Sequence, residues 1–229
     1  MKEALEQIKE DIIKHAKISG RKSEDITLIA VSKTYPAEAI EEAISLGCEH
    51  FGENKVQELM NKVDVVKGNP KWHLIGHLQT NKVKYVIGHV ELIHSVDSLK
   101  LAQEIEKQSA KKGVVTSILI EVNVAKEDSK HGIYMEDVLE LVKAIAQLPH
   151  VKIEGFMTVA PFTEDPEENR TIFKALYDLS VDIQKQNIDN ISTSILSMGM
   201  SNDYKIAIEE GATLIRIGTA LFGARDYNR

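Results

Sequence analysis

The feature that most constrains the fold is a regular alternation of short apolar, β-rich runs with amphipathic helical patterns along the whole chain. Strands are predicted over eight segments, residues 28–33, 49–52, 72–75, 92–96, 115–124, 152–159, 194–198 and 213–217. Nearly continuous apolar strands that are joined by helices form a parallel sheet covered on both faces. Eight such units predict closure into a (β/α)8 barrel of the TIM type, which typically needs about 250 residues.

The helical patterns agree with this prediction and add one element. An extra helix is predicted before the first strand, over residues 2–17, because its aliphatic residues fall on one stripe among charged ones. The next helix is bounded by Pro36 and Gly47, since proline is tolerated in a first helical turn and glycine ends helices. Further helices are predicted from residue 54, near 80, over 97–111, 138–145, 172–183 and 202–210, and after Gly218.

The size of the chain favours one domain. With 229 residues, 43% of them hydrophobic, it can bury one sizeable core. An open, doubly wound sheet is the alternative architecture, but no Gly-x-Gly-x-x-Gly pattern follows any predicted strand. We therefore expect a single barrel domain over residues 1–229.

Composition excludes several classes of partner. The formal net charge is −7 and no long basic run occurs, which argues against nucleic acid and anionic membranes as ligands. The single cysteine, Cys48, rules out an intrachain disulfide and reads as a small buried hydrophobe. No secretory segment follows Met1 and no apolar run reaches the roughly 18 residues of a membrane span. We expect a cytoplasmic protein whose partners are small solutes.

The first predicted strand ends on a lysine. Ile29, Val31 and Lys33 share one face of a period-two strand, so the environment that buries the two aliphatic residues also receives the lysine stem. Lysines at strand ends commonly reach back to water. The alternative is a Schiff-base lysine, because burial lowers the pKa of an amine and makes its nucleophilic form available.

Two late loops have the composition of a phosphate site. Barrels of this kind work at the C-terminal ends of their strands and often bind phosphate in the loops after strands seven and eight. The first of these loops contains Gly199, Ser201 and Asn202, and the second contains Gly218 and Thr219. Small residues and hydroxyls at helix starts allow an anion to approach the backbone. Taken alone, the first loop is better explained by Ser201 or Asn202 as an N-cap, and the second loop favours the phosphate site.

An arginine lies inside the last predicted strand. Arg216 stands between two isoleucines, and its guanidinium needs an acceptor because it cannot lose its charge by deprotonation. A structural salt bridge with Glu121 or Glu154 is one explanation. A ligand that offers an acceptor is the other. The second explanation places the arginine, the phosphate loops and Lys33 at one end of one barrel.

A set of motifs in chain order carries a family resemblance: Ala30-Val31-Ser32-Lys33, Phe51-Gly52-Glu53-Asn54, Trp72-His73-Leu74-Ile75-Gly76, Gly155-Phe156-Met157-Thr158, Ser197-Met198-Gly199-Met200-Ser201-Asn202-Asp203 and Arg216-Ile217-Gly218-Thr219. These residues resemble the pyridoxal 5′-phosphate (PLP) homeostasis proteins, single-domain relatives of the alanine racemase barrel. The resemblance covers nearly the whole chain. It implies PLP as the cofactor and a role in buffering, carrying or delivering it, without an established turnover.

The same resemblance implies roles for six residues. Lys33 resembles the lysine that forms the internal aldimine, and Arg216 the group that faces the pyridine nitrogen. Phosphate contacts are implied for Ser201, Gly218 and Thr219. A pocket position is implied for Asn54. The expected partners are PLP and PLP-dependent apo-enzymes as recipients, and the expected state is a monomer.

Two enzymatic alternatives remain. A fixed cation at the pyridine nitrogen disfavours ring protonation and so weakens the cofactor as an electron sink. An amino-acid racemase is the first alternative, although the related racemases bring a catalytic tyrosine from a further domain and six residues follow Gly223 here. A Schiff-base aldolase is the second, but it needs acid-base side chains beside the lysine.

Three other groups of residues are expected to be structural. His73 and His77 have the spacing of zinc ligands, but the first falls in a strand and Gly76 intervenes, so they would not share a helical face. The charged loop 126–132 reads as a solvated turn, and the alternative is that its position at the active end lets Lys130 contact a phosphate or a transfer partner. The acidic segment 163–168 is typical of a helix start.

Overall fold

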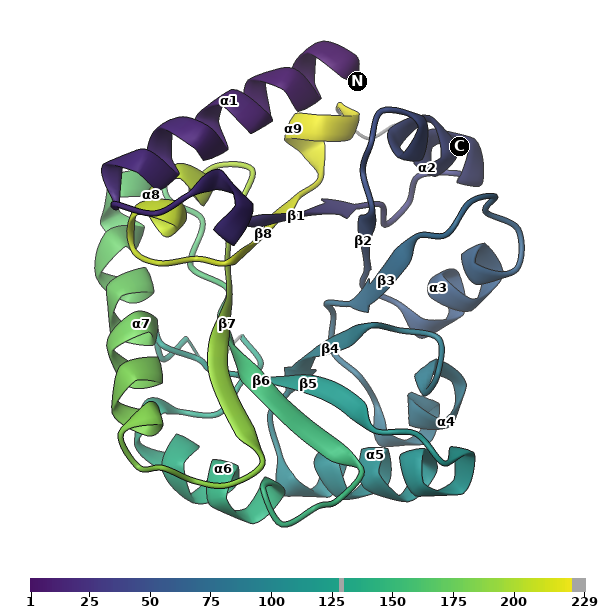
Figure 1. Cartoon of the computed structure of the whole chain (residues 1–229), viewed down its shortest axis with the longest axis vertical. Coiled ribbons are helices and arrows are strands. Elements are labelled where there is room, and N and C mark those ends of the chain that lie inside the picture. The colour runs from purple at the N-terminus through teal and green to yellow at the C-terminus, as the bar shows by residue number, and fades with distance from the viewer. Residues whose placement is uncertain (128–129, 224–229) are drawn as a thin grey trace.

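Eight parallel strands form a closed barrel in the computed structural model, which describes residues 1–127 and 130–223. Each strand pairs with its sequence neighbours, and β1 closes the ring by pairing with β8 (Figure 1). The strands are β1 (Thr27–Val31), β2 (His50–Glu53), β3 (Lys71–Leu74), β4 (Leu92–Val96), β5 (Thr116–Glu121), β6 (Val151–Met157), β7 (Ile191–Met200) and β8 (Leu214–Ile217). The predicted (β/α)8 barrel is confirmed.

The helices form a ring around the strands (Figure 1). They are α1 (Lys2–Ile18), α2 (Ala37–Ser45), α3 (Val56–Val63), α4 (Val83–Val86), α5 (Leu99–Lys112), α6 (Val138–Ile145), α7 (Arg170–Gln184), α8 (Tyr204–Glu209) and α9 (Thr219–Phe222). Short 3-10 turns are η1 (Ser23–Asp25), η2 (Thr80–Lys82), η3 (Met135–Asp137) and η4 (Pro166–Asn169). The acidic segment starts a helix as predicted, because the Asp165 side chain accepts from the Glu167 N–H over 3.0 Å just before α7.

The predicted extra helix, α1, covers the outside of the barrel beside α8. Its stripe of Leu5, Ile8 and Ile12 is buried. Asp11 on the same helix accepts from the Tyr204 hydroxyl over 2.6 Å, which attaches α1 to α8. No helix within residues 1–127 and 130–223 combines the length and the apolar composition that crossing a bilayer requires.

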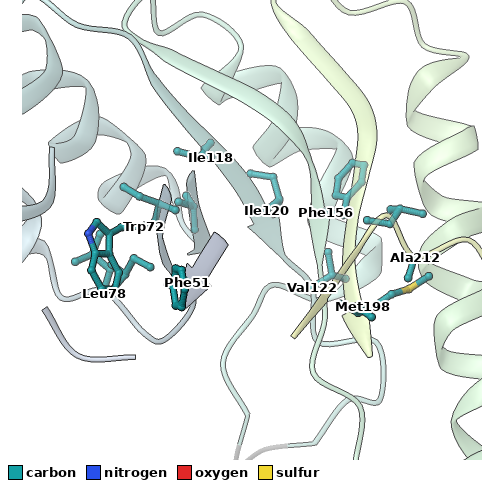
Figure 2. Close-up of a cluster of buried hydrophobic side chains, with 14 of the residues drawn as sticks. Phe51, Trp72, Leu78, Ile118, Ile120, Val122, Phe156, Met198 and Ala212 are labelled. Atoms are coloured by element: carbon teal, nitrogen blue, oxygen red, sulfur yellow. The ribbon is translucent and has the colours of Figure 1, made fainter. Parts of the chain in front are cut away.

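The apolar core has two parts. The larger lies between the sheet and the helices, where Phe51, Trp72 and Leu78 group on one side and Phe156 and Met198 on another (Figure 2). Cys48 belongs to this part and is buried as expected, and burial raises the pKa of its thiol. The smaller part fills the barrel interior, and its buried members are Ile29, Leu92, Leu119, Met157 and Leu214. Buried polar side chains, among them His73, His94 and Arg216, lie in the barrel as well.

Candidate functional site

A cavity of about 470 Å³ opens at the C-terminal ends of the strands. It is lined by all six residues predicted for the site, Lys33, Asn54, Ser201, Arg216, Gly218 and Thr219. The rest of the lining is mainly apolar and consists of Val31, Ile75, Val159, Phe162, Met200 and Asn202. Contributions from β1, β2, β7 and β8 therefore meet at one place, as parallel strands in a barrel allow.

Lys33 lies in a tight turn after β1, because the strand ends at Val31 and not at the predicted residue 33. The Tyr35 N–H closes the turn by donating to the Ser32 carbonyl over 3.0 Å. Thr34 has a φ of 71°, in the left-handed region that a non-glycine residue rarely adopts. Lys33 is half-buried and lines the cavity with Val31, as their shared strand phase predicted.

A second lysine supports this turn from α3. Lys62 Nζ donates to the Ser32 carbonyl over 2.8 Å. It also donates to Glu53 Oε1 and to Glu58 Oε1, each over 2.7 Å. The Ser32 hydroxyl donates to Glu53 Oε1 over 2.6 Å. We call Ser32, Glu53, Glu58 and Lys62 the Lys62 cluster.

The Lys62 cluster fixes both neighbours of the site lysine. Glu58 accepts from the Thr34 N–H on the far side of the turn, so the backbone before and after Lys33 is anchored. Burial raises the pKa of the Glu53 carboxyl above its ordinary value, and the charge of Lys62 opposes that shift. This cluster was not predicted from the sequence, although the i,i+4 spacing of Glu58 and Lys62 on a helix was a usable signal.

Asn54 follows β2 directly and brings a hydrogen-bonding group to the cavity. Its Oδ1 is buried and has no hydrogen-bond partner among the residues that the structure describes. A buried polar atom without a partner costs about 1–3 kcal/mol, so this atom suits a ligand or an ordered water. Gly76 allows the next loop to pack here, because a Cβ at that position would lie 2.5 Å from the Asn54 carbonyl oxygen.

Arg216 reaches the cavity from β8 and is 4% exposed. Its Nη1 donates to Ser197 Oγ over 2.6 Å, and its Nη2 donates to the Thr158 carbonyl over 2.8 Å. Both acceptors are neutral. A guanidinium has five N–H donors, so these two hydrogen bonds use only part of its donor capacity.

Neither carboxylate considered from the sequence forms a salt bridge with Arg216 within the described part of the chain. Glu154 pairs with Lys152 instead, over 2.8 Å. Glu121 acts on the guanidinium only through space. Burial lowers the pKa of Arg216 to about 10, and the negative charges of Asp203 and Glu121 oppose that shift.

Glu121 is a buried acid at the end of β5. Burial raises its pKa to about 7, the charge of Asp97 adds to this effect, and Arg216 opposes it. Its Oε2 has no hydrogen-bond partner among the described residues. The carboxyl therefore titrates near neutral pH, which its residue type alone did not indicate.

The loops after β7 and β8 are tied together at the cavity. Ser201 Oγ accepts from the Ala220 N–H over 3.3 Å. The N-cap of α8 is Asp203, so neither Ser201 nor Asn202 is the cap that the sequence left open. Gly199 has a φ of 89°, and a Cβ there would lie 2.5 Å from a side chain of α8. Glycine thus lets the loop approach the helix closely.

The two histidines with zinc-like spacing are separated by the fold. His73 is 2% exposed in β3, whereas His77 lies exposed beyond the strand. The His77 ring stacks on His131 with a centroid distance of 4.1 Å, and Asp97 lies close to both. One ligand atom from each of these three side chains lies within 4.8 Å of the others, a spacing compatible with a metal ion, and His73 takes no part in this group.

Other residues singled out from the sequence lie away from the cavity. Lys130 is half-buried and is not among the described residues that line the cavity. Its neighbours Asp128 and Ser129 fall outside the described residues. The Tyr35 hydroxyl donates to the Gly223 carbonyl over 2.8 Å, which agrees with a packing role.

A larger cavity, of about 550 Å³, lies between α7 and β7. Its lining is rich in hydroxyl and amide side chains and includes one charged group, Arg21. That guanidinium already donates to the carbonyls of Ala212 and Ile208 on the helix side. The described residues that line this cavity include no lysine, so it has no counterpart of the amine at the strand ends.

Comparisons with known proteins agree with the geometry. The chain matches the family described as alanine racemase, N-terminal domain, over residues 5–226. It is 45% identical to a pyridoxal phosphate homeostasis protein of Aquifex aeolicus over 226 residues, which cover 98% of each chain. A protein of the same name from Escherichia coli is 39% identical over 232 residues, 98% of this chain and 97% of the relative. This chain belongs to the pyridoxal phosphate homeostasis protein family.

Solved structures place this family member in the same fold. PipY of Synechococcus elongatus with PLP bound has a TM-score of 0.81 at 35% identity, covering 93% of this chain and 100% of that one. Alanine racemase from Corynebacterium glutamicum has a TM-score of 0.66 at 16% identity, covering 98% of this chain and 62% of that one. At that identity, the likeness to the racemase shows the barrel fold alone.

Proposed function

We propose that this protein binds PLP in the cavity at the strand ends and acts in the homeostasis of that cofactor. The observation that carries the proposal is the meeting of an amine, a guanidinium and two hydroxyls on one cavity, from Lys33, Arg216, Ser201 and Thr219. The relative that is 45% identical is named for the same role, and PipY, at 35% identity, has been solved with PLP bound.

The residues present fit PLP. The cavity volume of about 470 Å³ falls in the range of roughly 300–1,000 Å³ that is usual for small-molecule sites. The buried Asn54 Oδ1, without a partner among the described residues, is an acceptor that a bound ligand or its water could satisfy. When bound, PLP supplies an aldehyde carbon that reacts with amines and a pyridine ring that withdraws electrons.

Each residue then has a defined task. The Lys33 amine would hold the aldehyde carbon covalently, with release of water, and the Lys62 cluster fixes the backbone on both sides of this lysine. The hydroxyls of Ser201 and Thr219, with the backbone at Gly218, would hold the phosphate by hydrogen bonds to a charged acceptor. Arg216 would supply a positive charge near the ring nitrogen, and Asn54 lines the same cavity. The whole barrel is thereby one PLP-binding unit.

Arg216 favours carriage of the cofactor over amino-acid chemistry. A fixed guanidinium beside the pyridine nitrogen would disfavour a second positive charge there, so a bound ring would stay unprotonated and would withdraw electrons weakly. A site that binds PLP firmly but activates it poorly suits a protein that stores or delivers it. We propose apo-forms of PLP-dependent enzymes as recipients and a monomer in the cytosol as the carrier.

The direct test is reductive trapping. Wild-type protein treated with PLP and then borohydride is expected to carry one pyridoxyl group, located by mass spectrometry on the peptide that contains Lys33. The Lys33→Ala variant should lose this label and remain folded, whereas the matched control Lys130→Ala should keep it. Full labelling of Lys33→Ala would overturn the assignment of the lysine.

The racemase alternative is tested on the same material. Two of the tyrosines that the structure describes, Tyr35 and Tyr204, already donate their hydroxyls to Gly223 and Asp11. We expect PLP-loaded protein to produce no D-alanine from L-alanine above the Lys33→Ala background. Sustained turnover would replace carriage with racemisation as the function.

The oligomeric state and the delivery of PLP need separate measurements. Light scattering tests the monomer. Delivery is tested by mixing PLP-loaded protein with an apo-enzyme and following the recovery of that enzyme's activity. Recovery should be faster than when a dialysis membrane keeps the two proteins apart. Equal rates in the two arrangements would mean that PLP passes only through solution.

A further inference from the structure

Four polar side chains cross the barrel interior in a continuous line of hydrogen bonds that ends at Arg216. His50 Nδ1 lies 2.8 Å from His73 Nε2, and His73 Nδ1 lies 2.9 Å from His94 Nε2. His94 Nδ1 lies 2.9 Å from Ser197 Oγ, which accepts from Arg216 Nη1 over 2.6 Å. We call His50, His73, His94 and Ser197 the histidine relay. It starts at the first residue of β2 and ends beside the cavity.

The relay is buried and uncharged. His73 is 2% exposed, and His94 and Ser197 are 0% exposed. Burial lowers the pKa of His73 to about 3 and that of His94 well below its ordinary value, and for His94 the positive charges of a protonated His73 and of Arg216 would add to the effect. Burial also lowers the pKa of the half-buried His50. At neutral pH each ring is therefore neutral, with one N–H donor and one acceptor nitrogen.

Arg216 sets the direction of every bond in the relay. A guanidinium can only donate, so Ser197 Oγ accepts from it and has a single hydrogen of its own to give. His94 Nδ1 is the other hydrogen-bonding neighbour of that hydroxyl, so it is the acceptor, and the proton of His94 must sit on Nε2. The next two bonds follow in the same way, since His94 donates to His73 and His73 donates to His50. His94 and His73 are thus Nε2–H tautomers, and His50, which accepts at Nδ1, is the third.

The opposite direction leaves a buried donor unsatisfied. If each ring carried its proton on Nδ1, Ser197 would accept from both His94 and Arg216. Its own hydroxyl hydrogen would then have no acceptor among the contacts of the described residues. An unsatisfied buried donor costs about 1–3 kcal/mol. One direction is therefore strongly preferred, and it turns the acceptor end of every ring toward the guanidinium.

We propose that the histidine relay is a positioning device that orients Arg216 toward the cavity with neutral dipoles, and that it makes the cofactor site sensitive to changes at His50. Neutral acceptors hold the guanidinium without cancelling its charge, which a carboxylate would do. The three histidines act through Arg216 and are positioning residues. The effect on PLP rests on the proposed function, whereas the tautomers do not depend on it.

The first measurement uses the protein without ligand. Long-range ¹H–¹⁵N spectra at pH 7.5 distinguish the two neutral tautomers and the charged form of each histidine. We expect His50, His73 and His94 all to be neutral with the proton on Nε2. Opposite tautomers on His73 and His94, or a charged ring at either position, would overturn the relay.

Two variants test whether the line acts as a unit. Ser197→Ala removes the hydroxyl that sets the direction of the hydrogen bonds. The NMR signals of His94 should therefore change, and those of His73 should change with them although Ser197 forms no hydrogen bond with His73. Ser109→Ala is the matched control, because it deletes an equally buried serine hydroxyl that bonds Thr116 elsewhere. A change confined to His94 would reduce the relay to separate local contacts.

The far end of the relay provides the ligand test. His50→Leu removes the acceptor of His73, whereas His50→Gln can keep an acceptor oxygen in place. We expect His50→Leu to weaken PLP binding by about three- to tenfold, the scale of one hydrogen bond, and His50→Gln to bind nearly as wild type does. Equal binding by all three proteins would overturn the coupling to the cofactor site. If wild-type protein fails to bind PLP, the proposed function falls while the tautomers still decide the relay.

Discussion

Lys62 and Arg216 are both buried cations near the candidate site, but they are held in opposite ways. Lys62 is 7% exposed and has two carboxylate oxygens at 2.7 Å. Arg216 is 4% exposed, and it donates to a hydroxyl and a carbonyl. The charge of the lysine is neutralised where it lies, while that of the arginine remains effective in its surroundings. The first arrangement serves to fix a backbone turn, and the second leaves a cation for a ligand.

The largest expected difference comes from removing each cation. Lys62→Met leaves the carboxylates of Glu53 and Glu58 without their cation. Breaking a buried ion pair in this way lowers the free energy of unfolding by about 3–5 kcal/mol. Arg216→Met should cost less, on the order of 1–2 kcal/mol, because it leaves only neutral groups without a donor. Urea unfolding of the ligand-free variants measures both. Equal losses would mean that the two cations are held in equivalent ways.

The next test concerns the phosphate of the ligand, which the hydroxyls on the Arg216 side of the cavity are proposed to hold. Ser201→Ala combined with Thr219→Val should weaken PLP binding on the order of a hundredfold, since each hydrogen bond to a charged group contributes roughly 1.5–3 kcal/mol. Pyridoxal, which lacks the phosphate, should be affected far less. Titrations of both ligands give the ratio. Equal weakening of the two would move the phosphate to another loop.

Acid should act on the two regions in opposite directions. His73 has a pKa lowered to about 3, so below its ordinary value of 6.5 the unfolded chain takes up the proton first. Stability should then fall with decreasing pH by up to about 1.4 kcal/mol per unit for this histidine. The raised pKa of Glu53 has the reverse sign, because stability is lost as pH rises through it.

Comparison of wild type with His73→Gln between pH 7.5 and 5 isolates the first effect. The glutamine variant should be less stable at pH 7.5 but should lose less on acidification. Parallel stability curves for the two proteins would show that folding does not lower the pKa of His73.

The smallest effect is expected at Glu121, the acid that acts on Arg216 through space. Its pKa is raised to about 7 from 4.5, so its contribution to stability is present below pH 4.5 and is lost as pH rises toward 7. Between pH 6 and pH 7 this loss should be on the order of 1 kcal/mol. Glu121→Gln should remove it, which thermal unfolding at the two pH values can detect. An unchanged pH dependence would place the titration on another group.

The barrel and the meeting of Lys33, Ser201, Arg216, Gly218 and Thr219 at one end of it could be predicted because period-two strands and helical crossovers are local patterns. The pocket position of Asn54 was implied only by the family resemblance. Strand phase alone placed Lys33 beside Val31, and the position after strands seven and eight placed Ser201 and Thr219. The end of β1 was predicted too late, because the apolar run continues into a turn that the Lys62 cluster fixes from another helix.

What the sequence did not show are the contacts across the barrel. The acceptors of Arg216 are Ser197 in β7 and the Thr158 carbonyl just after β6, and nothing in the local sequence pairs an arginine with either. No role was predicted for His94, because a single histidine in an apolar strand forms no motif with its sequence neighbours. Such partners are chosen by the register of strands that are distant in sequence, which a linear pattern does not encode.

The pairing of β1 with β8 has a consequence for how the protein is made. Ile29 lies directly opposite Arg216 across this seam, and these residues are separated by nearly the whole chain. Lys33 therefore follows the first strand of the barrel to be synthesised, and Arg216 lies in the last. Closing so long a loop is entropically costly and slow, so the seam should be among the last contacts to form. A nascent chain that lacks β8 has no complete pocket, and a ligand that bridges both sides would favour the closed ring by mass action.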